Sequence, residues 1–230
     1  GQTGTIEVFD IGDGDPNPAV TGLTRLGNAN TTTLTLDGSD YDFGAGVTFG
    51  SATYTQNAGT GVFDVNNGPV SFLGNVVTNG TFSVDSNGGD ITVAGNISAT
   101  NATDTVSLSD GGGSGTITIG GTISGVRSVA LTGDTQVKLG GDITTTNGAS
   151  NNVTITGPAV LTADVDIDTS LNNGTISFSS TINNDGSGTA RNLVLDTGAG
   201  NISVSGIIGD VGNSGVAIGT IDINNSDGAG

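Results

Sequence analysis

Apolar residues alternate with polar residues in many short runs along this chain. A recurring form is Gly-x-Ile-x-Val-x-Gly-x-Ile, in which alternating apolar residues flank a small residue. Alternation with a period of two places Ile, Val and Leu on one face of a strand and Thr, Ser and Asp on the other. The pattern therefore predicts short β-strands throughout the chain and almost no helix. The clearest copies are Gly89–Ile97, Gly115–Ile123, Gln136–Ile143, Gly174–Ile182 and Gly200–Ile208.

The copies recur at a period that is typical of solenoids. Degenerate copies begin near Ala45, Gly68, Gly157 and Gly219, so successive copies start roughly 17 to 26 residues apart. A second, shorter alternating run precedes each copy. We therefore expect an all-β fold, a right-handed parallel β-helix of about nine coils with three strands per coil. An antiparallel sandwich would suit the strand spacing, but it has no reason to reuse one motif.

The composition indicates a fold with a thin core. Hydrophobic residues make up 33% of the 230 residues, and 42 residues are glycine, whereas a compact globule is nearly half apolar. Disordered chains lack the regularly spaced Val, Ile and Thr that are abundant here. A stack of flat coils needs only a narrow aliphatic column, with Gly, Asn and Asp at its corners.

Charge and missing residue types exclude several functions. The net charge is −18, with 22 acidic and four basic residues, which opposes binding to nucleic acid because phosphate contacts need Lys and Arg. There is no Cys or His, so disulfides and thiol or imidazole catalysis are impossible. We expect no membrane insertion, since no apolar run reaches 18 residues. A carbohydrate-active enzyme is the least favoured function, because the four cations fall in different predicted coils: Arg25, Arg127, Lys138 and Arg191.

Residues 1–30 differ from the repeat domain that we place at residues 31–230. The run Thr5–Ile11 is a lone strand candidate. It can be interpreted as a cap over the first coil or as a strand that pairs with the last coil of a neighbouring subunit. At the other end, Gly219–Ile223 is half a repeat, so either the chain once continued or another chain completes the coil. The predicted assembly residues are Ile6, Val8 and Ile11 at one end and Ile221 and Ile223 at the other.

An N-terminal acidic segment is a candidate calcium site. Asp10, Asp13, Asp15 and Asn17 place four oxygen ligands around glycines that permit a tight loop. Calcium binds six to eight oxygens from such flexible loops. The spacing does not match an EF-hand, and a solvated turn is the alternative.

In a second acidic segment, aspartates alternate with the apolar residues Val165 and Ile167. Asp164, Asp166 and Asp168 would stand on one outward strand face, about 7 Å apart, and Asp40 and Asp42 form a smaller version. Carboxylates in a row repel each other, so either solvent and salt screen them or a cation bridges them. Calcium is the only cofactor that the sequence suggests.

The segments Val153–Val165 and Asn192–Gly206 resemble the β-strand repeats of very large secreted bacterial proteins. These are the filamentous-haemagglutinin-like adhesins and the related autotransporter passengers. The resemblance covers about residues 60–230 and is one of repeat style. It implies a β-helix rod, export to the cell surface, and a role in adhesion, biofilm or an extracellular fibre. It supplies no ligand-binding residues.

Two functional hypotheses follow. The first is a non-enzymatic structural segment of an extracellular filament, sheath or surface adhesin, whose copies assemble end to end through strand edges. The second is an adhesin module that does not assemble and that binds surface glycans through outward Thr, Asn and Asp, with or without calcium. Both place the protein outside the cell or on its surface.

Overall fold

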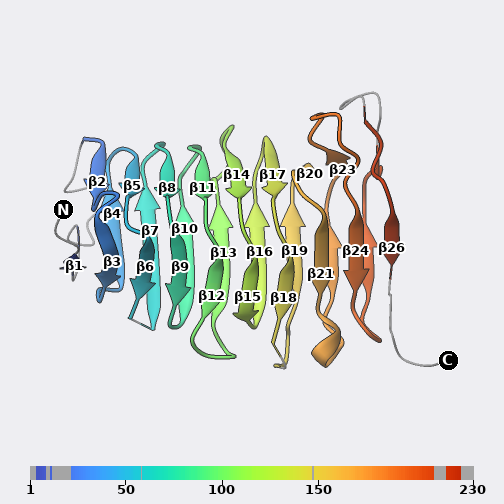
Figure 1. Ribbon diagram of the computed structural model, residues 1–230, viewed down its shortest axis with the longest axis horizontal. Helices are drawn as coiled ribbons and strands as arrows, with labels where there is room; N and C mark the ends of the chain where they lie inside the picture. Colours follow the sequence, from blue (N-terminus) through green and yellow to red (C-terminus); the bar gives the residue numbers. More distant parts are fainter. Residues whose placement is uncertain are drawn as a thin grey trace.

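The computed structural model describes residues 4–8, 11, 22–57, 59–146, 148–209 and 216–223. The chain winds into coils, and each complete coil contributes one short strand to each of three parallel sheets, so that the coils stack into a β-solenoid (Figure 1). Within the described residues the only helix is one 3₁₀ turn, Ser170–Asn172. None of the described helical structure is long and apolar enough to cross a bilayer. The all-β parallel solenoid is therefore confirmed.

Sheet A is the longest of the three sheets and contains ten of the described strands. Their stacking order follows the chain. They are β1 (Gly4–Val8), β3 (Thr31–Leu36), β6 (Thr53–Gln56), β9 (Asn75–Thr78), β12 (Ile97–Ala99), β15 (Ile123–Val126), β18 (Ile143–Thr145), β21 (Val165–Asp168), β24 (Leu193–Asp196) and β26 (Ile221–Ile223).

Sheets B and C contain eight described strands each. Sheet B consists of β4 (Asp40–Phe43), β7 (Thr60–Val65), β10 (Thr81–Asp85), β13 (Thr105–Ser109), β16 (Ser128–Thr132), β19 (Val153–Thr156), β22 (Ile176–Phe178) and β25 (Ile202–Val204). Sheet C consists of β2 (Thr24–Leu26), β5 (Val47–Phe49), β8 (Val70–Phe72), β11 (Ile91–Val93), β14 (Thr116–Ile119), β17 (Gln136–Leu139), β20 (Ala159–Leu161) and β23 (Ile182–Asn184). The stack has about eight coils rather than nine, because the repeat at Gly219 contributes only β26 among the described strands.

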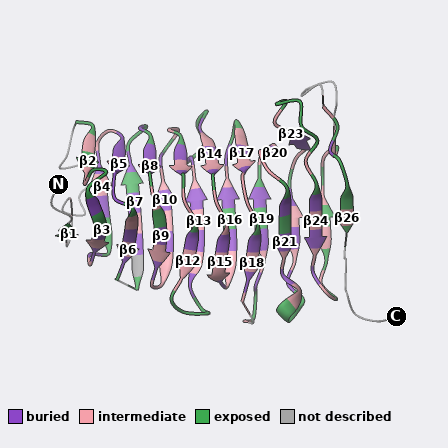
Figure 2. Ribbon diagram, viewed as in Figure 1, coloured by how far each residue is buried: buried purple, intermediate pink, exposed green. Residues whose placement is uncertain are grey.

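The core is a set of inward columns, one residue per coil, between outward polar positions (Figure 2). Parallel pairing in register places equivalent residues directly above one another, and the inward side chains exclude water along the whole length of the stack. One column of sheet A runs from the first strand to the last: Ile6, Leu34, Tyr54, Val76, Ile97, Ile123, Ile143, Ile167, Leu195 and Ile223.

Aromatic residues fill the N-terminal part of the core. Phe49 and Phe72 stack with their ring centroids 4.4 Å apart, and Tyr41 and Phe63 stack at 4.9 Å. Beyond β10 the buried hydrophobic side chains are aliphatic except for Phe178. The full aromatic cluster is Tyr41, Phe43, Phe49, Tyr54, Phe63, Phe72 and Phe82.

The repeat copies do not all stack on one another, although they share one motif. The copies that begin at Gly89, Gly115 and Gln136 place their first strands, β11, β14 and β17, in sheet C. The copies that begin at Gly174 and Gly200 place β22 and β25 in sheet B. All three sheets need the same alternating apolar pair, so the motif marks a strand but not the sheet that the strand joins.

Candidate functional site

The N-terminal end of the stack is formed by the predicted assembly segment. β1 pairs in parallel with β3 of its own chain, and Ile6 lies opposite Leu34. Ile6 is 38% exposed, and Val8 is half-buried against the core. Ile11 forms a parallel bridge to Tyr41 in sheet B, where its carbonyl accepts the Asp42 N–H at 2.8 Å. The segment thus adds rungs to the stack, and β2 within residues 1–30 likewise begins sheet C.

The C-terminal end is the opposite edge of the same sheet A. β26 pairs with β24, and Ile221 and Ile223 are 43% and 50% exposed. Ile223 stands in the inward column that begins at Ile6. In the part of the chain that the structure describes, β1 and β26 each have a strand on one side only. The structure therefore places Ile6 and Val8 at one end of a single sheet and Ile221 and Ile223 at the other.

Further apolar residues at the C-terminal end were missed by the sequence analysis. Ile202 and Val204 of β25 are only half-buried, Ile207 is 64% exposed, and Ile208 bridges Ile182 at the end of sheet C. The available signal was the alternation of Ile202 and Val204 within the Gly200–Ile208 copy of the motif.

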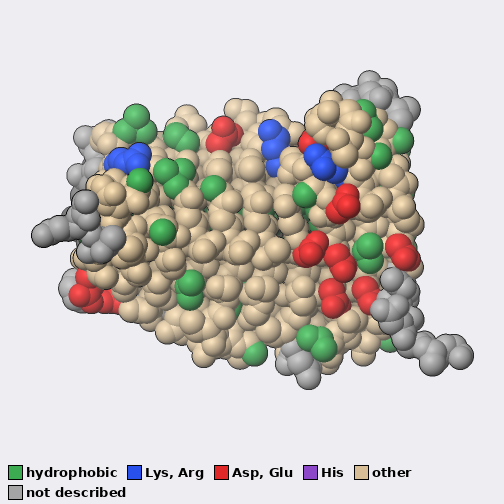
Figure 3. All heavy atoms as spheres, viewed as in Figure 1, with side chains coloured by type: hydrophobic (Ala, Val, Ile, Leu, Met, Phe, Trp, Pro, Cys, Tyr) green, Lys and Arg blue, Asp and Glu red, His purple; other side chains and the backbone are tan. Residues whose placement is uncertain are grey.

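An acidic face lies on the outer side of sheet A near its C-terminal end, where Figure 3 shows acidic side chains gathered. We call Asp142, Asp166, Asp168 and Asp196 the sheet A acidic face. Register places Asp168 beside Asp196, and the N–H of Asp166 donates to Asp142 Oδ1 at 2.9 Å. Partial burial, followed by the charges of Asp142, Asp168 and Asp196, raises the pKa of Asp166.

The predicted triad is only partly brought together on this face. Asp166 and Asp168 lie on β21, whereas Asp164 precedes the strand, and its Oδ1 accepts the N–H of Asn192 in the next coil at 2.9 Å. Asp168 Oδ1 accepts the N–H of Ser170 at 2.8 Å. Two of the three carboxylates therefore serve as acceptors that hold the backbone.

A tighter acidic group lies on sheet B. Oxygens of Asp40, Asp42 and Asp64 all lie within 4.8 Å of one another, the only such group of three among the described acids. Burial, and then the charges of Asp42 and Asp40, raises the pKa of Asp64. Three carboxylates could supply part of the oxygen shell that calcium requires. Asp64 was missed from the sequence, although it stacks on Asp42 in register.

The N-terminal calcium candidate, Asp10, Asp13, Asp15 and Asn17, lies outside the residues that the structure describes.

Sheet C presents the third side of the solenoid, and its outer column contains no acidic residue. Two of the four cations stand in it, and a cavity of about 520 Å³ opens beside one of them, Lys138. The three sides of the described stack thus differ in charge, with acidic clusters on sheets A and B. The outer column of sheet C is Arg25, Thr48, Ser71, Thr92, Thr118, Lys138, Val160 and Asn183.

Comparison of the chain with models of protein families, with curated proteins and with solved structures finds no match.

Proposed function

We propose that this protein is a structural subunit or segment of an extracellular bacterial filament, sheath or surface adhesin, and that copies assemble end to end. The joint is β26 of one copy against β1 of the next, which continues sheet A across the boundary. The observation that supports this proposal is the shared column of Ile6 and Ile223, the half-exposed first and last members of one stack.

Register favours a defined joint between the two edges. If the column continues, Ile223 of one copy lies opposite Ile6 of the next, and Asp222 lies opposite Thr5. This pairing places inward residues above inward residues and keeps Asp222 on the outside. Each joint then repeats the interaction that already holds neighbouring coils together, so addition can continue without closing into a ring.

The location outside the cell and the bacterial origin rest on the resemblance of Val153–Val165 and Asn192–Gly206 to secreted adhesin repeats. A sequence rich in Gly, Ser, Thr and Asn, with no cysteine or histidine, is compatible with a structural role. No enzymatic activity is part of the proposal.

The double substitution Ile221→Lys and Ile223→Lys tests assembly. Both side chains are at least 43% exposed, so folding should persist, whereas two buried cations at the joint would prevent association. We expect concentration-dependent rods for the wild type in negative-stain microscopy and light scattering, and single subunits for the variant. Measurements need physiological salt, because subunits of charge −18 repel one another.

The matched control is Leu171→Lys, which adds a cation at a side chain that is 61% exposed on the 3₁₀ turn, away from both edges. It should assemble like the wild type. Rods of unchanged length from the double variant would reject the β26–β1 joint. A wild type that remains single at every concentration would reject end-to-end assembly.

The second candidate function is a binding module that does not assemble. The cavity on the outer side of sheet C favours it, because a hollow of about 520 Å³ that contains a lysine can hold a small polar ligand. Single rods that bind glycan would support this candidate over the filament.

A further inference from the structure

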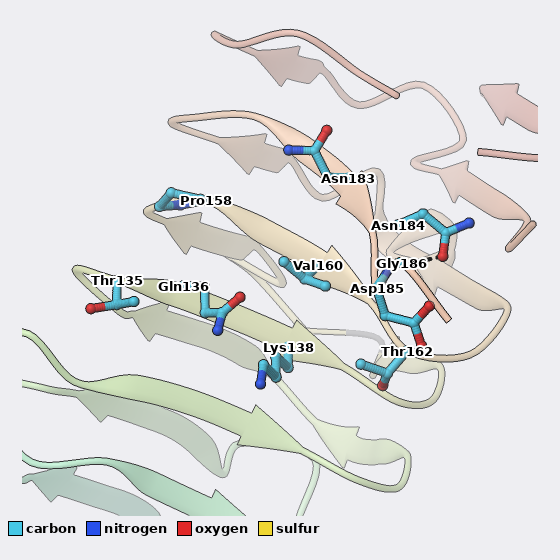
Figure 4. A pocket seen from close by; sticks show the side chains of 10 residues that line it. All are labelled: Thr135, Gln136, Lys138, Pro158, Val160, Thr162, Asn183, Asn184, Asp185 and Gly186. Atoms are coloured by element: carbon cyan, nitrogen blue, oxygen red, sulfur yellow. Dashed lines mark hydrogen bonds between the residues drawn. The ribbon is translucent and has the colours of Figure 1, made fainter. Parts of the chain in front are cut away.

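The cavity on sheet C spans three successive coils (Figure 4). Gln136 and Lys138 project from the outer side of β17, and Val160 projects from β20 above them. Thr162 and Asp185, which follow β20 and β23, lie at one end of the cavity. Its volume of about 520 Å³ falls within the range of pockets for small organic ligands.

The lining combines an apolar patch with hydrogen-bonding groups. Val160 and Pro158 are half-buried and offer aliphatic carbon, Val160 near the middle of the cavity and Pro158 at the end away from Asp185 (Figure 4). The amide of Gln136 lies beside this patch and can both donate and accept hydrogen bonds. The hydroxyl groups of Thr135 and Thr162 donate to the backbone carbonyls of Ser114 and Leu139, at 2.6 and 3.0 Å, so they remain acceptors for a ligand hydroxyl group. A sugar ring has the matching character, with aliphatic C–H groups on its faces and hydroxyl groups around its rim.

The uncompensated charge in this cavity is positive. The Arg191 Nη2 lies 3.5 Å from Asp185 Oδ2, which is the only ion pair among the described residues. Hydrogen bonds from Ser187, together with Arg191, hold the pKa of Asp185 below its ordinary value. The carboxylate is therefore ionised and already paired, whereas the half-buried Lys138 has no carboxylate partner in the described part of the chain. An anionic ligand group would supply one.

We propose that this cavity binds a uronic-acid residue of a polysaccharide. The Lys138 ammonium pairs with the sugar carboxylate, the ring lies over Val160, and Gln136 and Thr162 bond its hydroxyl groups. The cavity lies on the side of the solenoid, so it remains open whether or not the ends join. The assignment goes beyond end-to-end assembly, and it names a ligand for the binding-module alternative.

Isothermal titration with a galacturonate trimer tests this site. The buffer contains EDTA, so that calcium cannot bridge the sugar to the acidic clusters of sheets A and B. We expect binding of the trimer and at least about tenfold weaker binding by Lys138→Gln, because a charge-assisted bond to the carboxylate is lost. Thr162→Ala should weaken binding less, by about threefold. A neutral galactose trimer and acetate should each bind much more weakly than the galacturonate trimer.

Arg25→Gln is the matched control, because Arg25 occupies the same outer column of sheet C at the far end and the change removes the same charge. Its affinity should equal that of the wild type. An equal loss in Arg25→Gln and Lys138→Gln would overturn the site in favour of diffuse attraction. Equal affinity for the neutral trimer, or no binding of the charged trimer, would also overturn it.

The double variant Ile221→Lys, Ile223→Lys is also titrated with the galacturonate trimer. This titration distinguishes ligand binding at the cavity from end-to-end assembly. Retained binding by single subunits would leave the site standing even if the filament proposal failed. Loss of binding together with loss of rods would overturn an independent side-facing site.

Discussion

Asparagine and aspartate side chains hold successive coils together at the corners of the solenoid. Asn75 Oδ1 accepts the N–H of Asn96 at 2.9 Å, and Asn96 Oδ1 accepts the N–H of Thr122 in the next coil at 2.9 Å. At a corner the strand ladder is interrupted, so these short side chains satisfy backbone donors that would otherwise lack a partner. The sequence predicted Asn and Asp in turns from their local hydrogen bonds. The hydrogen bonds to the next coil could not be predicted from the sequence, because they depend on how the coils stack.

Glycines stack at the corner that precedes sheet A. Gly95, Gly121 and Gly141 occupy this corner in consecutive coils. A Cβ atom added to Gly121 would lie 2.8 Å from the backbone carbon of Gly95, and one added to Gly141 would lie 2.7 Å from that of Gly121. At this corner the neighbouring coils can therefore approach each other this closely only because the side chain is absent.

We expect Gly121→Ala to lower the free energy of unfolding by about 1–3 kcal/mol, because the backbone of the neighbouring coil has to move. Gly59→Ala is the control, since nothing lies within 4 Å of the position of its added Cβ. Urea denaturation of both variants measures the difference. Equal midpoints for the two variants would contradict the close approach of the glycines.

At the scale of single strands, the N-terminal elements differ from the rest because their inward positions are aromatic. Phe72 of β8 stacks on Phe49 of β5 and lies edge-on to Phe82 of β10 at 5.3 Å. These rings link neighbouring coils through stacked and edge-to-face contacts, which add stabilisation to that from burying their apolar surface. The strands β4 to β10 should therefore form the most strongly coupled part of the stack.

We expect Phe72→Ala to destabilise the protein by about 3–5 kcal/mol, because it opens a cavity within the aromatic cluster. Phe178→Ala removes an equally buried ring from β22, but no ring contact of Phe178 occurs among the described residues. Its cost should be smaller by about 0.5–1.5 kcal/mol, the additional energy of aromatic pairs. Urea unfolding of the two variants provides the comparison, and a larger loss for Phe178→Ala would refute special coupling in the N-terminal coils.

At the scale of the whole molecule, stacking concentrates like charges. In a parallel register, each outward residue lies one strand spacing from the equivalent residue of the next coil. If both residues are acidic, their carboxylates become neighbours. Partial burial, and then the neighbouring carboxylates that this arrangement brings close, raises the pKa of Asp64 on sheet B and of Asp166 on sheet A. Both groups bind a proton more readily in the folded chain than in the unfolded chain. Their ionisation therefore weakens the fold.

We expect the melting temperature to rise as the pH falls from 7 towards 4, since the folded forms of Asp64 and Asp166 take up protons before the unfolded chain does. Asp185 acts in the opposite direction, but its lowered pKa confines that effect to pH values below its ordinary 3.8. Asp166→Asn should be more stable than the wild type at pH 7 and should show a smaller rise on acidification. Thermal melts followed by circular dichroism give both slopes, and a melting temperature that falls between pH 7 and pH 5 would contradict this account.

The candidate sites were only partly predictable from the sequence. The alternating runs at Thr5–Ile11 and Gly219–Ile223 predicted strands, and among the described residues β1 and β26 are the outermost strands of sheet A. Alternation is a local pattern, so it can be recognised without knowing the fold. Asp64 and the cavity beside Lys138 were not predicted. Each depends on residues that lie one or two coils apart in the chain, and their proximity is set by the stacking register.

The sequence by itself determined the fold class, since alternation with a period of two fixes which side chains face inward and a recurring motif requires stacked coils. Only the tertiary structure decided which of the three sheets each run joins. The motif at Gly89 begins in sheet C, whereas its counterpart at Gly174 begins in sheet B. All three sheets bury the same alternating aliphatic pair against one narrow core, so local composition carries no label for a side of the solenoid. That label comes from the lengths of the intervening turns and from the pairing of each strand with the coil before it.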